Sequence, residues 1–177
     1  MGFPWTLVPD PAILEQNYLR LCEAIHPDCH SEAGEAFQEA SEEKASLVNQ
    51  AYQILKDDLS RAEYLLTLYG GPDSAAHRSM APEILEQQLE WRERLEGSPE
   101  LDRPTLEKFL ARVKRDWAEL WTRLQTIFPA ETRPNPEETS KKSGDWRIQA
   151  RELLNHGRFL RTLSRELNER IHKKLLE

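Results

Sequence analysis

Side chains suited to chemistry are concentrated in one short stretch, residues 22–30. Cys22, His26, Cys29 and His30 carry donor atoms that metal ions take as ligands, but their spacing matches no common structural zinc pattern. Cys22 also falls in an apolar stripe, where a small buried thiol is ordinary. We therefore interpret Cys22 as a packing residue and expect no metal and no other cofactor, with a metal site as the alternative.

Catalytic motifs are missing from the rest of the sequence. It contains no nucleophile elbow, phosphate-binding loop, HExxH pair or dinucleotide fingerprint. His77, His156 and His172 lie in polar sequence contexts, so we interpret them as solvated surface residues rather than as general bases. The sequence therefore indicates that the protein is not an enzyme.

The second candidate for function is a turn, His26-Pro27-Asp28. A residue before proline is pushed out of the helical region, so a helix that precedes this turn should end at His26. The tripeptide would then be an exposed corner that combines a fixed backbone angle, an imidazole and a carboxylate. Taken alone, it is better explained as a simple helix stop followed by an N-cap.

Two helices are predicted on either side of this corner. Asp10 is a suitable N-cap for a helix over residues 11–25, and apolar residues recur at helical spacing from about residue 35 to residue 56. A short helix over 61–69 follows, which we expect to open with a capping box formed by Ser60 and Glu63. These elements predict a small unit, residues 1–70, built on an antiparallel helix pair.

Three longer helices are predicted in the second half of the chain. They should cover residues 82–96, 102–128 and 145–176, each with an apolar stripe at steps of three and four. Complementary stripes of this kind are typical of a three-helix bundle over residues 82–177. Residues 71–81 would be the linker between the two units.

The composition favours an all-α protein. The 177 residues include 31% charged and 38% apolar residues and only 7 glycines, and no run of 18 apolar residues could cross a membrane. The net charge of −7 is unevenly spread, because residues 141–177 are basic whereas the rest is acidic, which argues against nucleic acid as a partner. Two cysteines give no disulfide framework and fit a reducing compartment.

Several segments together resemble the J domain of the HscB family, the co-chaperones of iron–sulfur cluster assembly. The pattern joins Tyr18, Leu21 and the His26-Pro27-Asp28 corner to Asn49-x-Ala51-Tyr52 and to the run Arg61-Ala62-Glu63-Tyr64-Leu65-Leu66. In the second half, the runs Ile84–Glu93 and Arg158–Leu163 resemble helices of the family's C-terminal bundle. The resemblance covers residues 10 to 177 and implies an L-shaped, all-α molecule. Its J domain would have a shortened or absent first helix.

The resemblance also implies a function and its residues. The protein would deliver an IscU-type iron–sulfur scaffold protein to a DnaK/HscA-type chaperone and stimulate that chaperone's ATPase, in the cytoplasm of a bacterial-type cell. The chaperone contact would use His26, Pro27, Asp28, Tyr18 and Arg20. The scaffold-binding face would use Leu85, Glu86, Leu89, Glu90, Glu93 and Phe159.

This sequence differs from the family pattern at a few positions. Cys29 stands where the family usually has lysine, and Glu86 replaces an apolar residue. Residues 1–70 are strongly acidic, with 12 Asp/Glu against 4 Lys/Arg, although the family's J domain is usually basic before the corner. Two alternatives stay open: a general J protein with another client, and a J-like structural module that activates no ATPase.

Overall fold

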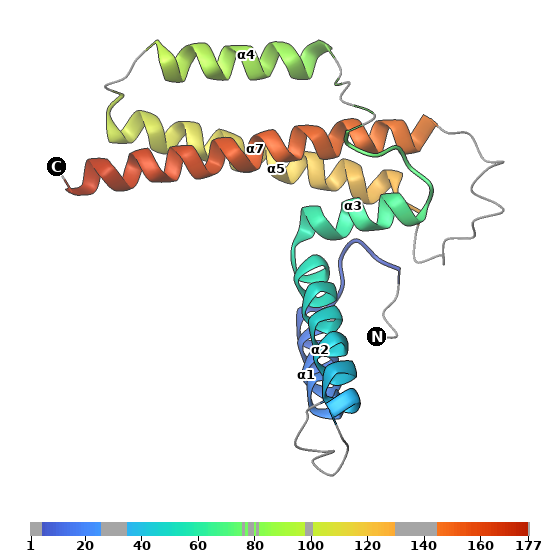
Figure 1. Cartoon of the computed structure of the whole chain (residues 1–177). Helices are drawn as coiled ribbons and strands as arrows, with labels where there is room; N and C mark the ends of the chain where they lie inside the picture. Colours follow the sequence, from blue (N-terminus) through green and yellow to red (C-terminus); the bar gives the residue numbers. More distant parts are fainter. Residues whose placement is uncertain are drawn as a thin grey trace. The chain divides into compact units, whose positions relative to one another are not determined.

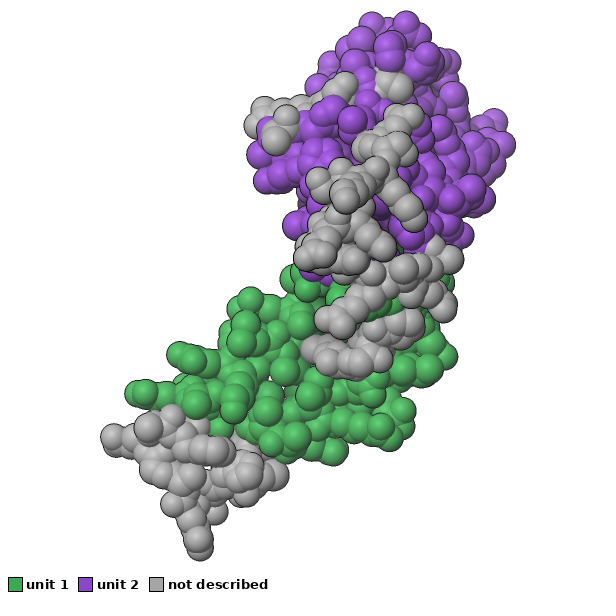
Figure 2. Space-filling model, turned by 90° about the vertical axis from the view of Figure 1, so that its right-hand side faces the viewer, with its two compact units in different colours: residues 1–65, 130–135 green, residues 66–129, 136–177 purple. Residues whose placement is uncertain are grey.

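The computed structural model describes residues 5–25, 35–75, 77, 80, 82–97, 101–129 and 145–176, and all the regular elements within them are helices. These residues form two compact units, and the boundary between the units lies between Leu65 and Leu66 (Figure 2). The predicted all-α class is confirmed, whereas the expected L shape and the expected domain limits stay predictions. In chain order the helices are α1 (Pro11–Ile25), α2 (Glu35–Lys56), α3 (Asp58–Leu68), α4 (Pro82–Glu96), α5 (Arg103–Ile127) and α7 (Asp145–Leu176).

Unit 1 is built on α1 and α2, which pack side by side in opposite directions (Figure 1). The Asp10 carboxylate accepts a hydrogen bond from the Ala12 backbone N–H at 2.9 Å, as expected for an N-cap, and Pro11 occupies the first helical position. The buried apolar side chains of this unit come from the N-terminal segment, α1 and α3: Leu7, Leu14, Leu59, Ala62 and Leu65.

The start of α3 differs from the sequence-based expectation. Helix α3 begins at Asp58, and the Asp57 carboxylate accepts hydrogen bonds from both the backbone N–H (2.8 Å) and the hydroxyl (2.7 Å) of Ser60. The prediction that Ser60 and Glu63 form a capping box was therefore wrong. Asp57 is as good a cap as serine and lies three residues earlier, so the helix gains one more turn.

A buried arginine ties the N-terminal segment to the helices of unit 1. Arg61 is only 4% exposed, and its Nε donates to the carbonyl of Leu7 at 2.9 Å. The two other guanidinium nitrogens donate to the carbonyl of Leu55 and to the carboxylate of Asp58, each at 2.5 Å. A guanidinium offers several donors in a fixed fork, so one side chain can hold three acceptors from separate stretches of the chain. Residues near Leu7 are thereby fixed over the core without a helix of their own.

Unit 2 is a bundle whose tightest pair is α5 and α7 (Figure 1). Asp102 caps α5, because its carboxylate accepts from the backbone N–H of Thr105 at 3.1 Å. Hydrogen bonds from the Thr105 side chain and from its backbone N–H lower the pKa of Asp102. Leucines and one valine recur at helical steps on the facing stripes. The buried members are Leu106, Val113, Leu120 and Leu124 on α5 and Leu153, Leu154, Leu160, Leu163 and Leu167 on α7.

The segment that leads into α4 is held against α7. The Nε of Arg151, a residue 2% exposed, donates to the carbonyl of Pro72 at 2.8 Å, and Asn155 donates to the carbonyl of His77 at 3.0 Å. Where α3 ends, Gly70 adopts a positive φ of 70°, a conformation that glycine takes without steric cost. Pro72 and His77, two of the residues expected in the linker, are therefore held against α7.

None of the described helices is long and apolar enough to cross a membrane.

Candidate functional site

The expected chaperone contact centres on His26, Pro27 and Asp28, which lie outside the described residues. Their flanks are described: α1 ends at Ile25 and α2 begins at Glu35. In sequence, the corner thus lies between α1 and α2, which pack on each other. Its role as a chaperone contact stays a prediction.

Tyr18 links the two helices that carry this corner. Its ring stacks on Tyr52 of α2, with centroids 4.0 Å apart, and its hydroxyl donates to the Asn49 side chain at 2.8 Å. A hydrogen bond with Cys22 raises the pKa of the Tyr18 hydroxyl. These contacts make Tyr18 a brace between α1 and α2, whereas Arg20 is exposed on α1. Arg20 is therefore accessible to a partner, whereas Tyr18 is only partly accessible.

The α4 residues expected to bind the scaffold share one side of the helix. Leu85 and Leu89 are 44% and 61% exposed and lie one turn apart, which is unusual for leucines in a packed bundle. The three glutamates of the set are exposed as well, and Glu90 pairs with Arg94 at 2.5 Å. At about 100° per residue, the five positions cover an arc of about 140°. We call this surface the α4 face: Leu85, Glu86, Leu89, Glu90 and Glu93.

The opposite side of α4 is anchored in the bundle. Trp91 is 2% exposed, meets the Phe109 ring edge-to-face at 5.3 Å and lies under the guanidinium of Arg112 at 5.2 Å. At the end of α4, Arg170 of α7 donates to the carbonyl of Leu95 at 3.1 Å. The α4 face is therefore held outward by a large buried aromatic. Its leucines can bury apolar area against a partner, and its glutamates favour a basic rim around that contact.

Phe159, the sixth expected residue, belongs to α7. Its side chain is partly buried, and its ring stacks on the imidazole of His156 with centroids 6.4 Å apart. It is thus neither a fully exposed anchor nor a core residue. The structure brings the five α4 residues together on one helix, while Phe159 is contributed by another helix of the same unit.

His156 corrects the interpretation of the histidines. It was expected at the surface but is only 7% exposed, and its Nε2 has no hydrogen-bond partner among the described residues. Its position between Leu153 and Leu160, at steps of three and four, was a signal for burial that the polar neighbours obscured. Burial lowers the pKa of His156, and the charge of Arg123 adds to the effect.

Acidification should therefore destabilise unit 2 through His156. Because its pKa in the folded state lies below the ordinary 6.5, the unfolded chain binds more protons, and stability present above about pH 6.5 is lost as pH falls below it. We expect His156→Leu to remove up to about 1.4 kcal/mol per pH unit from this dependence. Urea unfolding at several pH values measures it, and exposed His172→Leu is the control. Equal slopes in wild type and His156→Leu would contradict the prediction.

The metal alternative is not decided by the described residues. Within them no group of three or more potential ligands comes together, but His26, Cys29 and His30 lie outside them. Cys22 is partly buried on α1 and is not disulfide-bonded, in keeping with a packing role.

Comparisons with known proteins match both units. Residues 80–168 match the family described as the HSCB C-terminal oligomerisation domain, and residues 10–64, which include the His26-Pro27-Asp28 corner, match the DnaJ domain. The "Co-chaperone protein HscB homolog" of Shewanella halifaxensis is 38% identical over 99 residues, which are 55% of this chain and 57% of the relative. The homologue of Burkholderia thailandensis is 41% identical over 90 residues, or 50% of this chain and 51% of the relative. The matches thus span little more than half the length of these relatives.

Solved structures extend the similarity to nearly the whole chain. "Chaperone HscB from Vibrio cholerae" superposes with a TM-score of 0.72 at 27% identity, over 98% of this chain and 95% of the other. The human co-chaperone protein HscB superposes with a TM-score of 0.71 over 94% of this chain and 77% of the other, and at 24% identity it supports the fold alone.

Proposed function

Since this chain belongs to the HscB family and carries a J domain ahead of the family's C-terminal domain, we propose that it is a co-chaperone and not itself an enzyme. It would deliver an IscU-type iron–sulfur scaffold protein to a DnaK/HscA-type chaperone and stimulate the chaperone's ATPase. The observation that carries the proposal is the presence of both domains in one chain, with the His26-Pro27-Asp28 corner inside the J-domain match. The bacterial relatives favour a cytoplasmic protein of bacterial type.

The two parts of the site would divide the work. His26, Pro27 and Asp28, together with Arg20 of α1, would contact the ATPase, and Tyr18 would hold the helix pair α1 and α2. The α4 face, with Phe159, would hold the scaffold. Unit 1 is acidic, so long-range attraction to an acidic chaperone surface would be weak, and a cognate chaperone should present basic groups instead.

Steady-state ATP hydrolysis tests the chaperone arm. We expect the intact protein to stimulate a DnaK/HscA-type ATPase, and to do so further when the scaffold is present. His26→Gln should remove the stimulation, because it removes the imidazole of the corner. His172→Gln, at an exposed position of α7, should leave the stimulation unchanged. No stimulation by the wild-type protein would favour the J-like structural module.

Calorimetric titration with the scaffold tests the second arm. We expect Leu85→Ser/Leu89→Ser to weaken binding at least about tenfold, because each leucine would bury apolar surface worth about 1.5–3 kcal/mol. Leu175→Ser is a matched control, since Leu175 is 54% exposed at the far end of α7. Both variants should stimulate the ATPase normally when the scaffold is absent. Stimulation by a wild-type protein that binds no scaffold would favour the general J protein.

A further inference from the structure

His156 is a buried titratable residue that has no part in the function proposed above. No described residue makes a hydrogen bond to its Nε2. A buried imidazole nitrogen without a partner gives up the hydrogen bond that water would make to it, and this loss costs free energy. A leucine at this position, between Leu153 and Leu160, would avoid that cost. The imidazole therefore calls for a role beyond packing.

Phe159 lies beside this imidazole. The two residues are one helical turn apart on α7, and their rings have centroids 6.4 Å apart and planes inclined by 23°. Rings at this separation and inclination are offset-stacked. The Phe159 side chain is partly buried, so part of its ring packs on the helix surface while another part stays accessible to a partner. The position of the imidazole thus limits where the Phe159 ring can lie.

The surroundings of His156 oppose a positive charge on its ring. Burial lowers the pKa of His156, and the positive charge of Arg123 on α5 lowers it further. On α7 itself, Glu152 lies one turn earlier, but its carboxylate faces His77 of the segment before α4, 4.0 Å from the His77 Nε2. The buried residues of α4 carry no charge. Since no described carboxylate is hydrogen-bonded to the His156 Nε2, a protonated ring would be stabilised only by reaching water.

We propose that His156 is a positioning residue for scaffold binding: its neutral imidazole supports the Phe159 ring, and uptake of a proton displaces that ring and weakens binding. This role rests on the scaffold binding proposed above and adds a pH dependence to it. The charged imidazole turns toward water and moves the Phe159 ring that lies beside it. A scaffold that covers Phe159 buries His156 further and so favours the neutral form. Binding is therefore strongest above about pH 6.5 and weakens as pH falls below it.

Calorimetric titration of the full chain with an IscU-type scaffold protein, at about pH 7.5 and about pH 5, is the first test. His156→Phe keeps a flat ring beside Phe159 but cannot take up a proton. The rise in Kd from the higher to the lower pH should be at least about threefold larger for wild type than for His156→Phe, within the limit of about tenfold per pH unit that one proton allows. Titration of the scaffold itself is common to both proteins and cancels in this comparison. Far-UV circular dichroism at both pH values checks that the helices stay folded.

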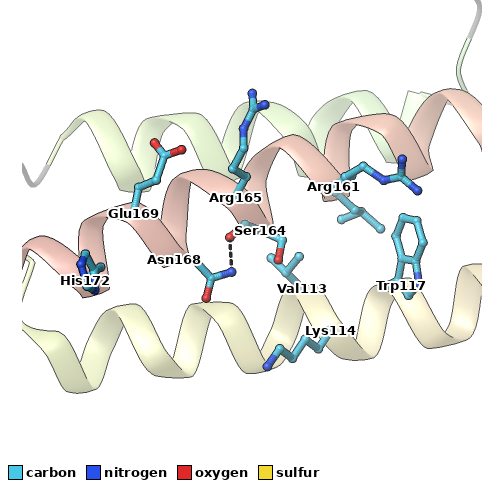
Figure 3. A pocket seen from close by; sticks show the side chains of 10 residues that line it. Val113, Lys114, Trp117, Arg161, Ser164, Arg165, Asn168, Glu169 and His172 are labelled. Carbon is cyan, nitrogen blue, oxygen red and sulfur yellow. Dashed lines mark hydrogen bonds between the residues drawn. The ribbon is translucent and has the colours of Figure 1, made fainter. Parts of the chain in front are cut away.

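His172→Phe is the matched control. His172 is an exposed histidine of the same helix and lies at one end of a groove between α5 and α7, which neither His156 nor Phe159 lines (Figure 3). The variant also loses one histidine, but it should keep the pH dependence of wild type. Phe159→Ala should lose that dependence, because the ring that transmits the change is gone. Adding His156→Phe to Phe159→Ala should then change the pH dependence no further.

NMR spectra of the free protein separate failure of this inference from failure of the proposed function. The ring signals of Phe159, assigned by comparison with Phe159→Leu, should shift with pH as His156 titrates and should not do so in His156→Phe. Equal pH dependence of scaffold binding in wild type and His156→Phe, or Phe159 signals that do not follow the titration, would overturn the role of His156 alone. If wild type binds no scaffold even at about pH 7.5, the proposed scaffold binding is wrong, and the role of His156 in it is wrong as well.

Discussion

Replacing Trp91 with alanine should lower the free energy of unfolding of unit 2 by about 3–5 kcal/mol, the range for truncating a large buried aromatic. Trp91 is 2% exposed and is the anchor of α4, through an edge-to-face contact with Phe109 and the guanidinium of Arg112 above its ring. Its Nε1 has no hydrogen-bond partner among the described residues, so the loss comes from packing rather than from a polar contact.

The effect should be concentrated in α4. Without the indole, the helix keeps mainly Leu95 in the core and its polar links, such as the 3.2 Å hydrogen bond from Gln87 to Asp116. Hydrogen exchange should therefore show faster exchange of α4 amides, with unit 1 unchanged. Trp91→Phe is the control, because it keeps an aromatic ring against Phe109. It should retain more than half of the free energy of unfolding that Trp91→Ala loses. Slow exchange of α4 in Trp91→Ala would contradict this account.

Loss of this anchor should also weaken the proposed scaffold binding, although Trp91 is not on the α4 face. Leu85 and Leu89 are exposed because the opposite side of α4 is fixed. A helix that frays no longer presents both leucines together, and ordering it again on binding costs free energy. If Trp91→Ala weakens binding and Trp91→Phe restores part of it, Trp91 acts by positioning α4 rather than by contacting the scaffold directly.

Much of the fold was predictable because the chain marks its helix ends clearly. Pro11 and Pro82 stand at the first position of α1 and α4, and Asp102 caps α5, as local chemistry predicts. The all-α class and the resemblance to the HscB family are both confirmed. Where two good caps compete, as at Asp57 and Ser60, local rules do not decide which one starts the helix, and the prediction was wrong.

Burial of polar side chains was not predictable to the same degree. Periodicity counts apolar residues, so His156 was passed over although it lies on the buried side of α7. The exposed leucines of α4 are the converse case. The apolar residues of α4 belong to two sides of the helix, since Trp91 and Leu95 are buried whereas Leu85 and Leu89 are exposed. Only the resemblance, rather than the spacing, singled out Leu85 and Leu89 as candidate binding residues. Which face a helix buries depends on its partners, which lie far away in sequence.

Arg61 is the clearest example of such long-range dependence, and replacing it with alanine should lower the stability of unit 1 by about 3 kcal/mol. Its hydrogen bond to Leu7 joins residues that are 54 positions apart, so no local sequence pattern predicts it. Alanine would leave the carbonyls of Leu7 and Leu55 without their charged donor, and bonds to charged groups are each worth about 1.5–3 kcal/mol. Asp58 adds little, because its side chain is 54% exposed.

Hydrogen exchange should show where this stability is lost. In Arg61→Ala, amides near Leu7 and in the first turn of α3 should exchange faster, while α5 and α7 should not change. Arg61→Lys should recover only part of the protection, because one ammonium cannot hold three separate acceptors in the geometry of the guanidinium fork. Arg20→Ala, at an exposed position of α1, should stay within about 0.5 kcal/mol of wild type. If Arg61→Lys were as stable as wild type, charge alone would hold the N-terminal segment. The account based on three hydrogen bonds from the guanidinium would then be wrong.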